Sequence, residues 1–459
     1  MSPQSQAKEI QMGIPKTPWM MALFAAAVPA VVGGAPPTKI ADTSDPVLER
    51  LVEEALHENP DARSAAAEAD AARFRIAPAG TLPDPFLSLN YQNDGRQFSL
   101  GTKEMTFLGA TFSQPLPWPG KLRLAGEIAG GEAKQVESAV LGRSRRSVEA
   151  RVRRAYAEWQ LATALRNLAE ERRSTWREIE GVVRARYSAG LAVQQDLLRA
   201  QAEILRLDEE AAVETANVAA RLADLDRAVG RPQDMPVENA RPLDLDPALP
   251  ELSRLLESIR AGHPELAGAE AAIQTDKLRV DLTKKEFLPD FVASAGPMYR
   301  GGLDPMWQVG LGISLPIYSG SRQRNRLREA EANLQSGEAR LASARQELEF
   351  RTRERYETLK GVLRAAQIDR DGVIPIDQLS LESAIASYRT GRVPFVTVLD
   401  ALNALYSDRS NLYVRLADAG KLRVAIDEAD LQTGPAMAPS VRPAASMSSN
   451  AASPAGSMR

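Results

Sequence analysis

The sequence repeats itself, because five short motifs of its first half return in the same order about 200 residues later. Repetition at a fixed period means that one structural unit occurs twice, and this constrains the architecture more than any other feature. The paired motifs are His57-Glu-Asn-Pro60 with Gly262-His-Pro264, Leu82-Pro-Asp84 with Leu288-Pro-Asp290, Ser113-Gln-Pro-Leu116 with Ser314-Leu-Pro-Ile317, Arg153-Arg-Ala-Tyr156 with Arg353-Glu-Arg-Tyr356, and Tyr187-Ser-Ala-Gly190 with Tyr388-Arg-Thr-Gly391. We therefore predict a first repeat over 36–230, a proline-rich linker over 231–250 and a second repeat over 251–431.

Each repeat is predicted to contain a helix, two strands and a pair of long helices. In the first repeat these are helix 46–76, strands 86–93 and 105–113, and helices 121–188 and 193–229. In the second they are helix 251–286, strands 291–299 and 307–315, and helices 321–389, kinked at Pro375, and 395–431. The stretch 121–188 contains no proline, so one helix of roughly 100 Å is expected at about 1.5 Å per residue.

The strand segments alternate between apolar and small or polar residues. Trp307, Val309, Leu311, Ile313 and Leu315 alternate with Gln308, Gly310, Gly312 and Ser314. This period of two is typical of a wall with one apolar face, and the strand length suits a tilted membrane crossing. A lone hairpin of this kind is more often a half-buried sheet of a soluble domain, whereas two hairpins that each precede a long helix favour a membrane barrel. Four strands cannot close a barrel in lipid, so we predict that three chains supply twelve strands.

The long helices carry apolar residues every seven positions. Leu197, Ile204, Ala211, Val218 and Leu225 form one series, and Val398, Leu405, Leu412, Ala419 and Ile426 form the other. A sustained seven-residue repeat specifies supercoiled packing of helices. On its own, this pattern is more often that of a scaffold than that of a channel.

Composition excludes several functions. The chain has no cysteine, which excludes disulfides, thiol catalysis, thiolate metal sites and a lipidated N-terminal cysteine. Its 57 basic and 60 acidic residues leave no basic excess for a nucleic-acid surface. The sequence lacks the motifs of hydrolases, metalloproteases and phosphate-binding loops, and His57 and His263 are expected to cap helices or face solvent. We therefore predict a protein that is not an enzyme and has no catalytic residue, metal site or cofactor.

The two ends of the sequence have compositions of their own. Lys8 and Lys16 precede an apolar run over 19–32 and small residues at 33–35, which predicts an export signal peptide over 1–35 rather than a buried helix. The segment 432–459 is rich in Pro, Ala, Ser and Met and is predicted to be disordered.

Over 45–431 the chain resembles the TolC family of outer-membrane efflux channels. The resemblance is carried by the duplicated strand–strand–long-helix units, by the turns Tyr187-x-x-Gly190-Leu191 and Tyr388-x-x-Gly391, and by Val396-Thr-Val-Leu-Asp-Ala401. Two further stretches, Leu82-Pro-Asp-Pro85 and Gln114-Pro-Leu-Pro-Trp-Pro-Gly-Lys121, are similar to the CzcC- and CusC-like branch of heavy-metal efflux. The family implies a homotrimer with a twelve-stranded β-barrel in outer-membrane lipid and a periplasmic α-barrel tunnel. It also implies two partners, a periplasmic adaptor (membrane fusion protein) and an inner-membrane pump of the resistance-nodulation-division type, and a belt around the tunnel to which 231–250 would belong.

The resemblance also assigns residues to a pore gate at the periplasmic tip. Asp400 matches a ring aspartate, Asp196 and Tyr388 match positions that latch the closed tip, and Arg392 adjoins the position of a partner arginine. Two positions depart from the family pattern, because Thr397 replaces a second ring aspartate and Val393 replaces that arginine. The turns match the tips that meet the adaptor, through Gly190, Leu191, Gly391 and Arg392. Plainer roles remain open, since a glycine commonly ends a helix, an aspartate favours a first helical turn, and a solvated helix face is the default for Asp400.

The sequence thus predicts passive export of heavy-metal cations or small toxic compounds through a tripartite efflux system. An outer-membrane duct for type I protein secretion is an alternative that the same fold can serve. An alternative of another class is a periplasmic coiled-coil scaffold or adaptor, although an adaptor would show one helical hairpin flanked by small β-domains.

Overall fold

The computed structural model of the chain describes residues 45–233, 235, 237, 241–246 and 248–429. The predicted signal peptide and the predicted disordered tail lie outside these residues. The first repeat contains α1 (Pro46–Glu58), α2 (Pro60–Phe74), α3 (Ile76–Gly80), β1 (Phe86–Gln92), β2 (Phe107–Leu116), α4 (Lys121–Val136), η1 (Glu137–Gly142), α5 (Arg143–Ser188) and α6 (Gln194–Val229). The second contains α7 (Leu252–Gly262), α8 (Pro264–Lys285), β3 (Asp290–Tyr299), β4 (Met306–Ser314), α9 (Arg322–Ile368), η2 (Asp369–Val373), α10 (Ile374–Arg389) and α11 (Phe395–Glu428). Apart from the short α3, the same order of elements therefore occurs twice, as the repeated motifs predict.

The first helical segment of each repeat is divided, and the prediction of single helices over 46–76 and 251–286 was wrong. A proline is the first residue of both α2 and α8, and the residue before a proline is disfavoured in the helical conformation. The preceding helices therefore end just before Asn59 and His263, which both adopt extended backbone angles. Asn59 caps α2, since its Oδ1 accepts a hydrogen bond from the Asp61 amide at 2.9 Å and its Nδ2 donates to the Ala228 carbonyl at 2.8 Å.

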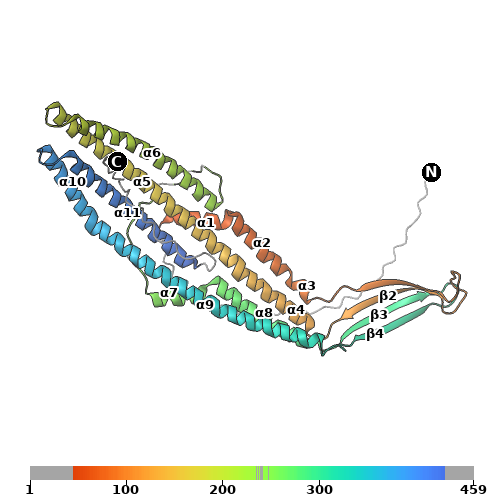
Figure 1. Ribbon diagram of the computed structural model, residues 1–459. Coiled ribbons are helices and arrows are strands. Elements are labelled where there is room, and N and C mark those ends of the chain that lie inside the picture. Colours follow the sequence, from red (N-terminus) through yellow and green to blue (C-terminus); the bar gives the residue numbers. More distant parts are fainter. Residues whose placement is uncertain (1–44, 234, 236, 238–240, 247, 430–459) are drawn as a thin grey trace, which may run out of the picture. The chain divides into compact units, whose positions relative to one another are not determined.

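The first long helix of each repeat is continuous, but it contains a short π-helical segment. η1 joins α4 to α5, and η2 joins α9 to α10. Pro375 lies in the first turn of α10 and cannot donate to the backbone, so the widened turn over 369–373 meets the proline where the sequence predicts a kink. Figure 1 shows α5 beside α6 and α10 beside α11, each pair as an antiparallel hairpin. Among the described residues, no helix combines the length and the apolar character needed to cross a bilayer.

The four strands form one antiparallel sheet in the order β1-β2-β3-β4 (Figure 1). Phe86 pairs with Ser113, Ser113 with Ser294, and Asp290 with Ser314. Because cross-strand partners share a face, this register gathers most of the large apolar side chains of the four strands on one face. The exposed members of this apolar sheet face are Leu87, Leu89, Tyr91, Leu108, Phe112, Tyr299, Trp307, Val309, Leu311 and Ile313. The opposite face carries mainly small and polar residues, among them Ser88, Asn90, Gly109, Thr111, Ser113, Ser294, Gln308 and Gly310. The predicted fold class, mainly helical with four strands, is confirmed.

Two tyrosines of the paired motifs hold the segment that connects the repeats. The Tyr156 hydroxyl donates to Asp45 Oδ2 at 2.7 Å and accepts from the Arg241 amide at 3.4 Å. The Tyr356 hydroxyl donates to the Pro250 carbonyl at 3.0 Å. Between these points Leu245 is buried against apolar residues of α7, α9 and α11. The duplicated tyrosines therefore fix the connecting segment against the helices at its middle and at its C-terminal end.

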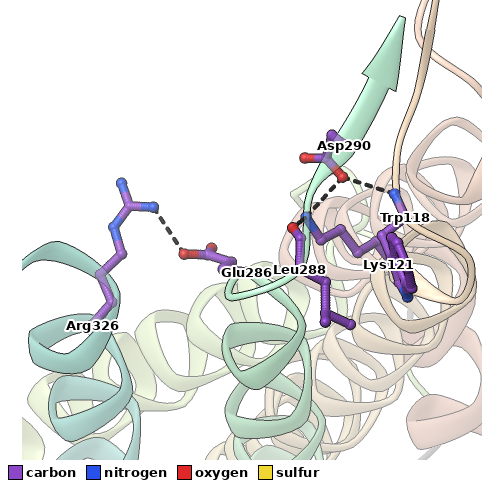
Figure 2. Close-up of polar contacts among 6 residues, drawn as sticks. All are labelled: Trp118, Lys121, Glu286, Leu288, Asp290 and Arg326. Atoms are coloured by element: carbon purple, nitrogen blue, oxygen red, sulfur yellow. Dashed lines mark hydrogen bonds and ion pairs between the residues drawn. The ribbon is translucent and has the colours of Figure 1, made fainter. Parts of the chain in front are cut away.

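The sheet is joined to the helices by contacts between the two copies, which Figure 2 shows. Asp290, the first residue of β3, accepts hydrogen bonds through Oδ1 from the Trp118 amide at 2.7 Å and from Lys121 Nζ at 2.8 Å. Lys121 is the first residue of α4, and its ammonium group also reaches the Leu288 carbonyl at 3.4 Å. These residues belong to the motifs Leu288-Pro-Asp290 and Gln114 to Lys121 that the sequence singles out. In this structure both motifs fix the end of the sheet against a helix.

Candidate functional site

The two turns between the long helices are built alike. α5 ends at Ser188 and α10 ends at Arg389, and each is followed by a glycine in the left-handed region, Gly190 with φ of 72° and Gly391 with φ of 76°. The Leu191 amide donates to the Arg186 carbonyl, and the Arg392 amide donates to the Ser387 carbonyl. Together with bonds from the glycine amides, these close the Schellman motif that ends many helices. The predicted turns are therefore present, and both require glycine for its conformational freedom.

Behind the turns, aromatic side chains pack the ends of the hairpins together. The Trp176 and Phe395 rings lie 6.2 Å apart in an edge-on arrangement, and the Phe395 and Tyr388 rings lie 5.6 Å apart. All three side chains are buried, within a cluster to which α5, α6, α10 and α11 contribute. The two turns are thus anchored on one apolar core.

Asp196 and Tyr388, predicted as latch residues, are in contact. The Tyr388 hydroxyl donates to Asp196 Oδ2 at 3.4 Å, which joins α10 to the first turn of α6. Burial and the nearby Asp196 carboxylate raise the pKa of Tyr388 above its usual value of 10.0, although Arg186 opposes the shift. The hydroxyl therefore stays protonated, and able to donate, throughout the neutral range.

Arg186 is a contact residue of this site that the sequence reasoning missed. Its guanidinium donates to the carbonyls of Tyr388, Arg389 (2.8 Å) and Leu191 (2.8 Å) and lies 4.7 Å from the centre of the Tyr388 ring. One side chain thus binds the carbonyl ends of both turns, where the helix dipole favours a cation. The signal in the sequence was a basic residue in the last turn of α5, but the equivalent position of the second copy is Ser387, so the comparison of copies did not reveal it.

The other residues assigned to the gate or to adaptor contact are exposed. Asp400 lies on α11 with an exposed carboxylate, and the Arg392 side chain is exposed at the turn. Within the described part of the chain neither side chain makes a hydrogen bond or ion pair. The structure therefore brings Asp196, Tyr388 and Arg186 together and leaves Asp400 and Arg392 apart from them. Exposed apolar residues surround the two turns, namely Tyr187, Leu191, Val193 and Val396.

Nothing in the described residues resembles a metal centre. They contain no group of three or more His, Asp or Glu side chains placed to hold an ion. His57 is exposed, whereas His263 is buried and its Nε2 lies 3.1 Å from the Ala429 carbonyl oxygen. His263 is the N-cap residue of α8, as one of the two expectations has it, although its ring makes no capping bond. The other expectation, that His263 faces solvent, was wrong, because the ring is covered by the end of α11.

Comparison with known proteins identifies the family to which this chain belongs. The sequence profile of the family described as "Outer membrane efflux protein" matches residues 51–231 and 255–428. The chain belongs to the outer membrane efflux protein family. The two matched ranges coincide closely with the two copies of the repeated unit.

Individual relatives are distant but span most of the chain. One is the "Probable outer membrane lipoprotein SilC" of Salmonella typhimurium, with 24% identity over 80% of this chain and 82% of that protein. Another is the "Toluene efflux pump outer membrane protein TtgC" of Pseudomonas putida, with 24% identity over 80% of this chain and 79% of that protein.

Solved structures of family members share the fold. The outer membrane protein VceC of Vibrio cholerae aligns with a TM-score of 0.69 and 19% identity, covering 84% of this chain and 96% of VceC. CusC aligns with a TM-score of 0.67 and 20% identity, covering 88% of this chain and 96% of CusC. As a member of the family, the chain is an outer-membrane efflux channel, a component of tripartite efflux pumps and not an enzyme.

Proposed function

We propose that three copies of this chain form a passive export duct through the outer membrane. The observation that carries the proposal is the apolar sheet face, where ten large side chains from all four strands are exposed in one chain. A contiguous apolar surface of this extent marks contact with lipid or with another protein. Both outer strands, β1 and β4, pair on one side only within the described residues, so closing the sheet without open edges requires further strands.

The helical turns are the proposed periplasmic gate. The contacts of Arg186, Tyr388 and Asp196 hold the α5–α6 turn against the α10–α11 turn and would have to break for the tip to widen. Three copies of Asp400 around the axis would repel one another and favour cations. The proposed gate thus combines a latch of three residues with a ring of carboxylates.

The adaptor is proposed to bind at the same end. The glycine turns present backbone groups and the exposed apolar side chains of Tyr187, Leu191 and Val193 to solvent. Apolar residues rimmed by charges such as Arg392 suit a protein partner rather than a small solute. The pump, proposed to be of the resistance-nodulation-division type, would supply the energy for transport.

The proposed substrates are heavy-metal cations or small toxic compounds. The similarity of Leu82-Pro-Asp-Pro85 and Gln114 to Lys121 to the heavy-metal branch favours cations, whereas the relative named for toluene efflux favours organic compounds. The chain offers no metal site of its own among the described residues, so selection of the substrate would lie with the pump.

A deletion strain tests this proposal directly. We would measure its growth inhibition by copper, cobalt, zinc, cadmium, dyes and antibiotics, with the intact gene restored on a plasmid as the control. Sensitivity confined to metals would support cation export, and sensitivity confined to dyes and antibiotics would support export of organic compounds. Unchanged resistance to the whole panel, in a strain shown to lack the protein, would contradict both substrate classes.

A further inference from the structure

Two oppositely charged residues at the outer edges of the sheet, Asp84 and Arg322, are the duplicates of two residues that form an ion pair within the chain. The joined pair is Lys121, which follows β2, and Asp290, which begins β3. In the paired motifs Asp290 corresponds to Asp84, just before β1, and Ser113 corresponds to Ser314 at the end of β4. Lys121 follows Ser113 at the same distance as Arg322 follows Ser314, so Arg322 is the duplicate of Lys121.

Asp84 and Arg322 have no partner within the described residues. Both residues are exposed, and neither side chain makes a hydrogen bond or ion pair with any part of the chain that the structure describes. They lie at opposite edges of the sheet, because β1 and β4 are its first and last strands. An intramolecular contact between them would require the sheet to close on four strands.

We propose that Asp84 of one copy and Arg322 of the next form an intermolecular ion pair that duplicates the one between Asp290 and Lys121. The inference rests on the trimer proposed above and specifies how its subunits meet. Edge β4 of one copy pairs antiparallel with edge β1 of its neighbour, and Asp84 then lies beside the start of the neighbour's α9, as Asp290 lies beside the start of α4. An arginine suits this position because its guanidinium can bind a carboxylate through two parallel hydrogen bonds.

The duplication also fixes the register of this contact. Within the chain Ser113 lies opposite Ser294. Ser314 is the duplicate of Ser113, and Ser88 follows Asp84 at the same distance as Ser294 follows Asp290. Ser314 of one copy should therefore lie opposite Ser88 of the next. This register keeps Leu87 and Leu89 on the same face as Ile313 of the neighbour, so the apolar sheet face continues across the interface.

Another register can be drawn from the hairpins. Phe86 lies opposite Ser113 in the first hairpin, whereas Asp290 lies opposite Ser314 in the second. If the pairing within the hairpins, and not the sequence motifs, decides which residues are equivalent, Phe86 takes the place of Asp84 as the duplicate of Asp290. β1 of one copy then shifts along β4 of the next, and Asn90 would lie opposite Ser314. Asp84 would then move away from the position that Asp290 occupies beside Trp118 and Lys121.

Disulfide trapping distinguishes the two registers, and the chain has no cysteine of its own to interfere. Directly opposed residues have Cβ atoms about 4.5–5.5 Å apart, within reach of a bridge after small shifts, whereas diagonal neighbours lie about 7–8 Å apart. We expect Ser88→Cys with Ser314→Cys to give covalent trimers on oxidation in outer membranes, and Asn90→Cys with Ser314→Cys to give none. Cross-linking of the second pair alone, or of neither pair while the noncovalent trimer persists, would overturn the inference and leave the proposed function standing.

Charge exchange tests the ion pair itself. Asp84→Arg and Arg322→Asp should each lower the temperature at which the detergent-solubilised trimer dissociates, and the double exchange should restore most of the loss. Asp94→Arg, which makes the same change of charge in the loop after β1, is the matched control and should leave the temperature unchanged. Equal effects of Asp84→Arg and Asp94→Arg, or no recovery in the double variant, would contradict the pair. Absence of any trimer in the unmodified protein would instead contradict the proposed function.

Discussion

At the scale of single residues, Arg186 connects the two helical turns through one side chain. We expect Arg186→Ala to remove its three carbonyl contacts and to destabilise the closed tip by about 1.5–3 kcal/mol, the range for hydrogen bonds of a charged group. Single-channel conductance in planar bilayers should rise several-fold. Arg186→Lys should restore it only in part, because an ammonium group cannot serve three separated carbonyls in the same way.

Arg392→Ala is the matched control for this prediction. It also removes one arginine from the turns, but the Arg392 side chain is exposed and makes no polar contact within the described chain. Conductance of this variant should match that of the unmodified channel. Equal conductance of the Arg186→Ala and Arg392→Ala variants would show that Arg186 does not hold the tip.

Asp400 gives a prediction about selectivity. If its three copies line a constriction, Asp400→Ala removes the negative ring and should reduce the preference for cations. The reversal potential in a salt gradient across a planar bilayer should shift toward zero. Unchanged reversal potentials would remove Asp400 from the pore and return it to a solvated helix face.

A pair of carboxylates on α10 and α11 gives a prediction about pH. Burial, with the neighbouring Asp408, raises the pKa of Asp377 above its usual 3.8, so ionisation of Asp377 is less favourable in the folded chain than in the unfolded one. The stability that the protonated Asp377 carboxyl contributes to the folded chain is therefore complete below pH 3.8 and is lost as the pH rises through the raised pKa. We expect Asp377→Asn to raise the midpoint of thermal unfolding at neutral pH and to have no such effect below pH 3.8.

Glu382→Gln provides the comparison, because Glu382 is an exposed carboxylate on the same helix. It should change the midpoint little at either pH. A stabilisation by Asp377→Asn that persists unchanged in acid would show that the effect does not come from charge.

The sequence singled out residues that occur in both copies or match the family, and it did not reveal contacts made by one copy alone. Tyr388 and Asp196 were predicted as latch residues and are in contact, while their role in a latch stays a prediction. Arg186 was not, since its importance depends on how two turns distant in sequence meet. The pair of Lys121 and Asp290 lay within recognised motifs, but its partners could be known only once the register of β2 and β3 was fixed.

At the scale of elements, the two glycine turns place the same demand on the backbone. Gly190 and Gly391 both have positive φ, so replacement by alanine should cost about 1–2 kcal/mol at either turn. A Cβ at Gly391 would make only an ordinary contact with Arg186 Nη2 at 3.4 Å, and a Cβ at Gly190 would have no neighbour within 4 Å. We therefore expect Gly190→Ala and Gly391→Ala to lower the free energy of unfolding by similar amounts, as measured by denaturant titration. A loss confined to one of the two variants would show that backbone strain is not their common cause.

The strands and long helices were predicted within a few residues, whereas the helix breaks were missed. Apolar periodicity is strong in the long helices and alternation is strong in the strands, so both could be located from the sequence. The breaks at Asn59 and His263 were marked by the prolines of the first pair of motifs, yet the helical pattern on both sides outweighed them. The π-helical segments leave no comparable pattern, because they depend on one inserted residue whose place is set by packing.

At the scale of the whole molecule, the proposed assembly predicts a trimer that needs detergent. The apolar sheet face of each chain would be covered by detergent, and the edges β1 and β4 would be paired between chains. Light scattering combined with size exclusion chromatography should give three chains in each detergent-bound particle. A chain that remains soluble and monomeric without detergent would contradict the channel and favour a periplasmic scaffold.

The two edges of the sheet, which have no partner strand within the described residues, also have a kinetic consequence. A chain whose sheet can be completed only by other chains cannot finish folding alone, so the last step of its maturation depends on the concentration of its own subunits. Until partners arrive, β1 and β4 present free backbone donors and acceptors to any extended segment nearby, and overproduction should divert chains into aggregates. When the protein is scarce, the rate at which functional channels appear should therefore rise more steeply than in proportion to the rate of synthesis. When the protein is abundant, the rate at which functional channels appear should rise less than in proportion to the rate of synthesis.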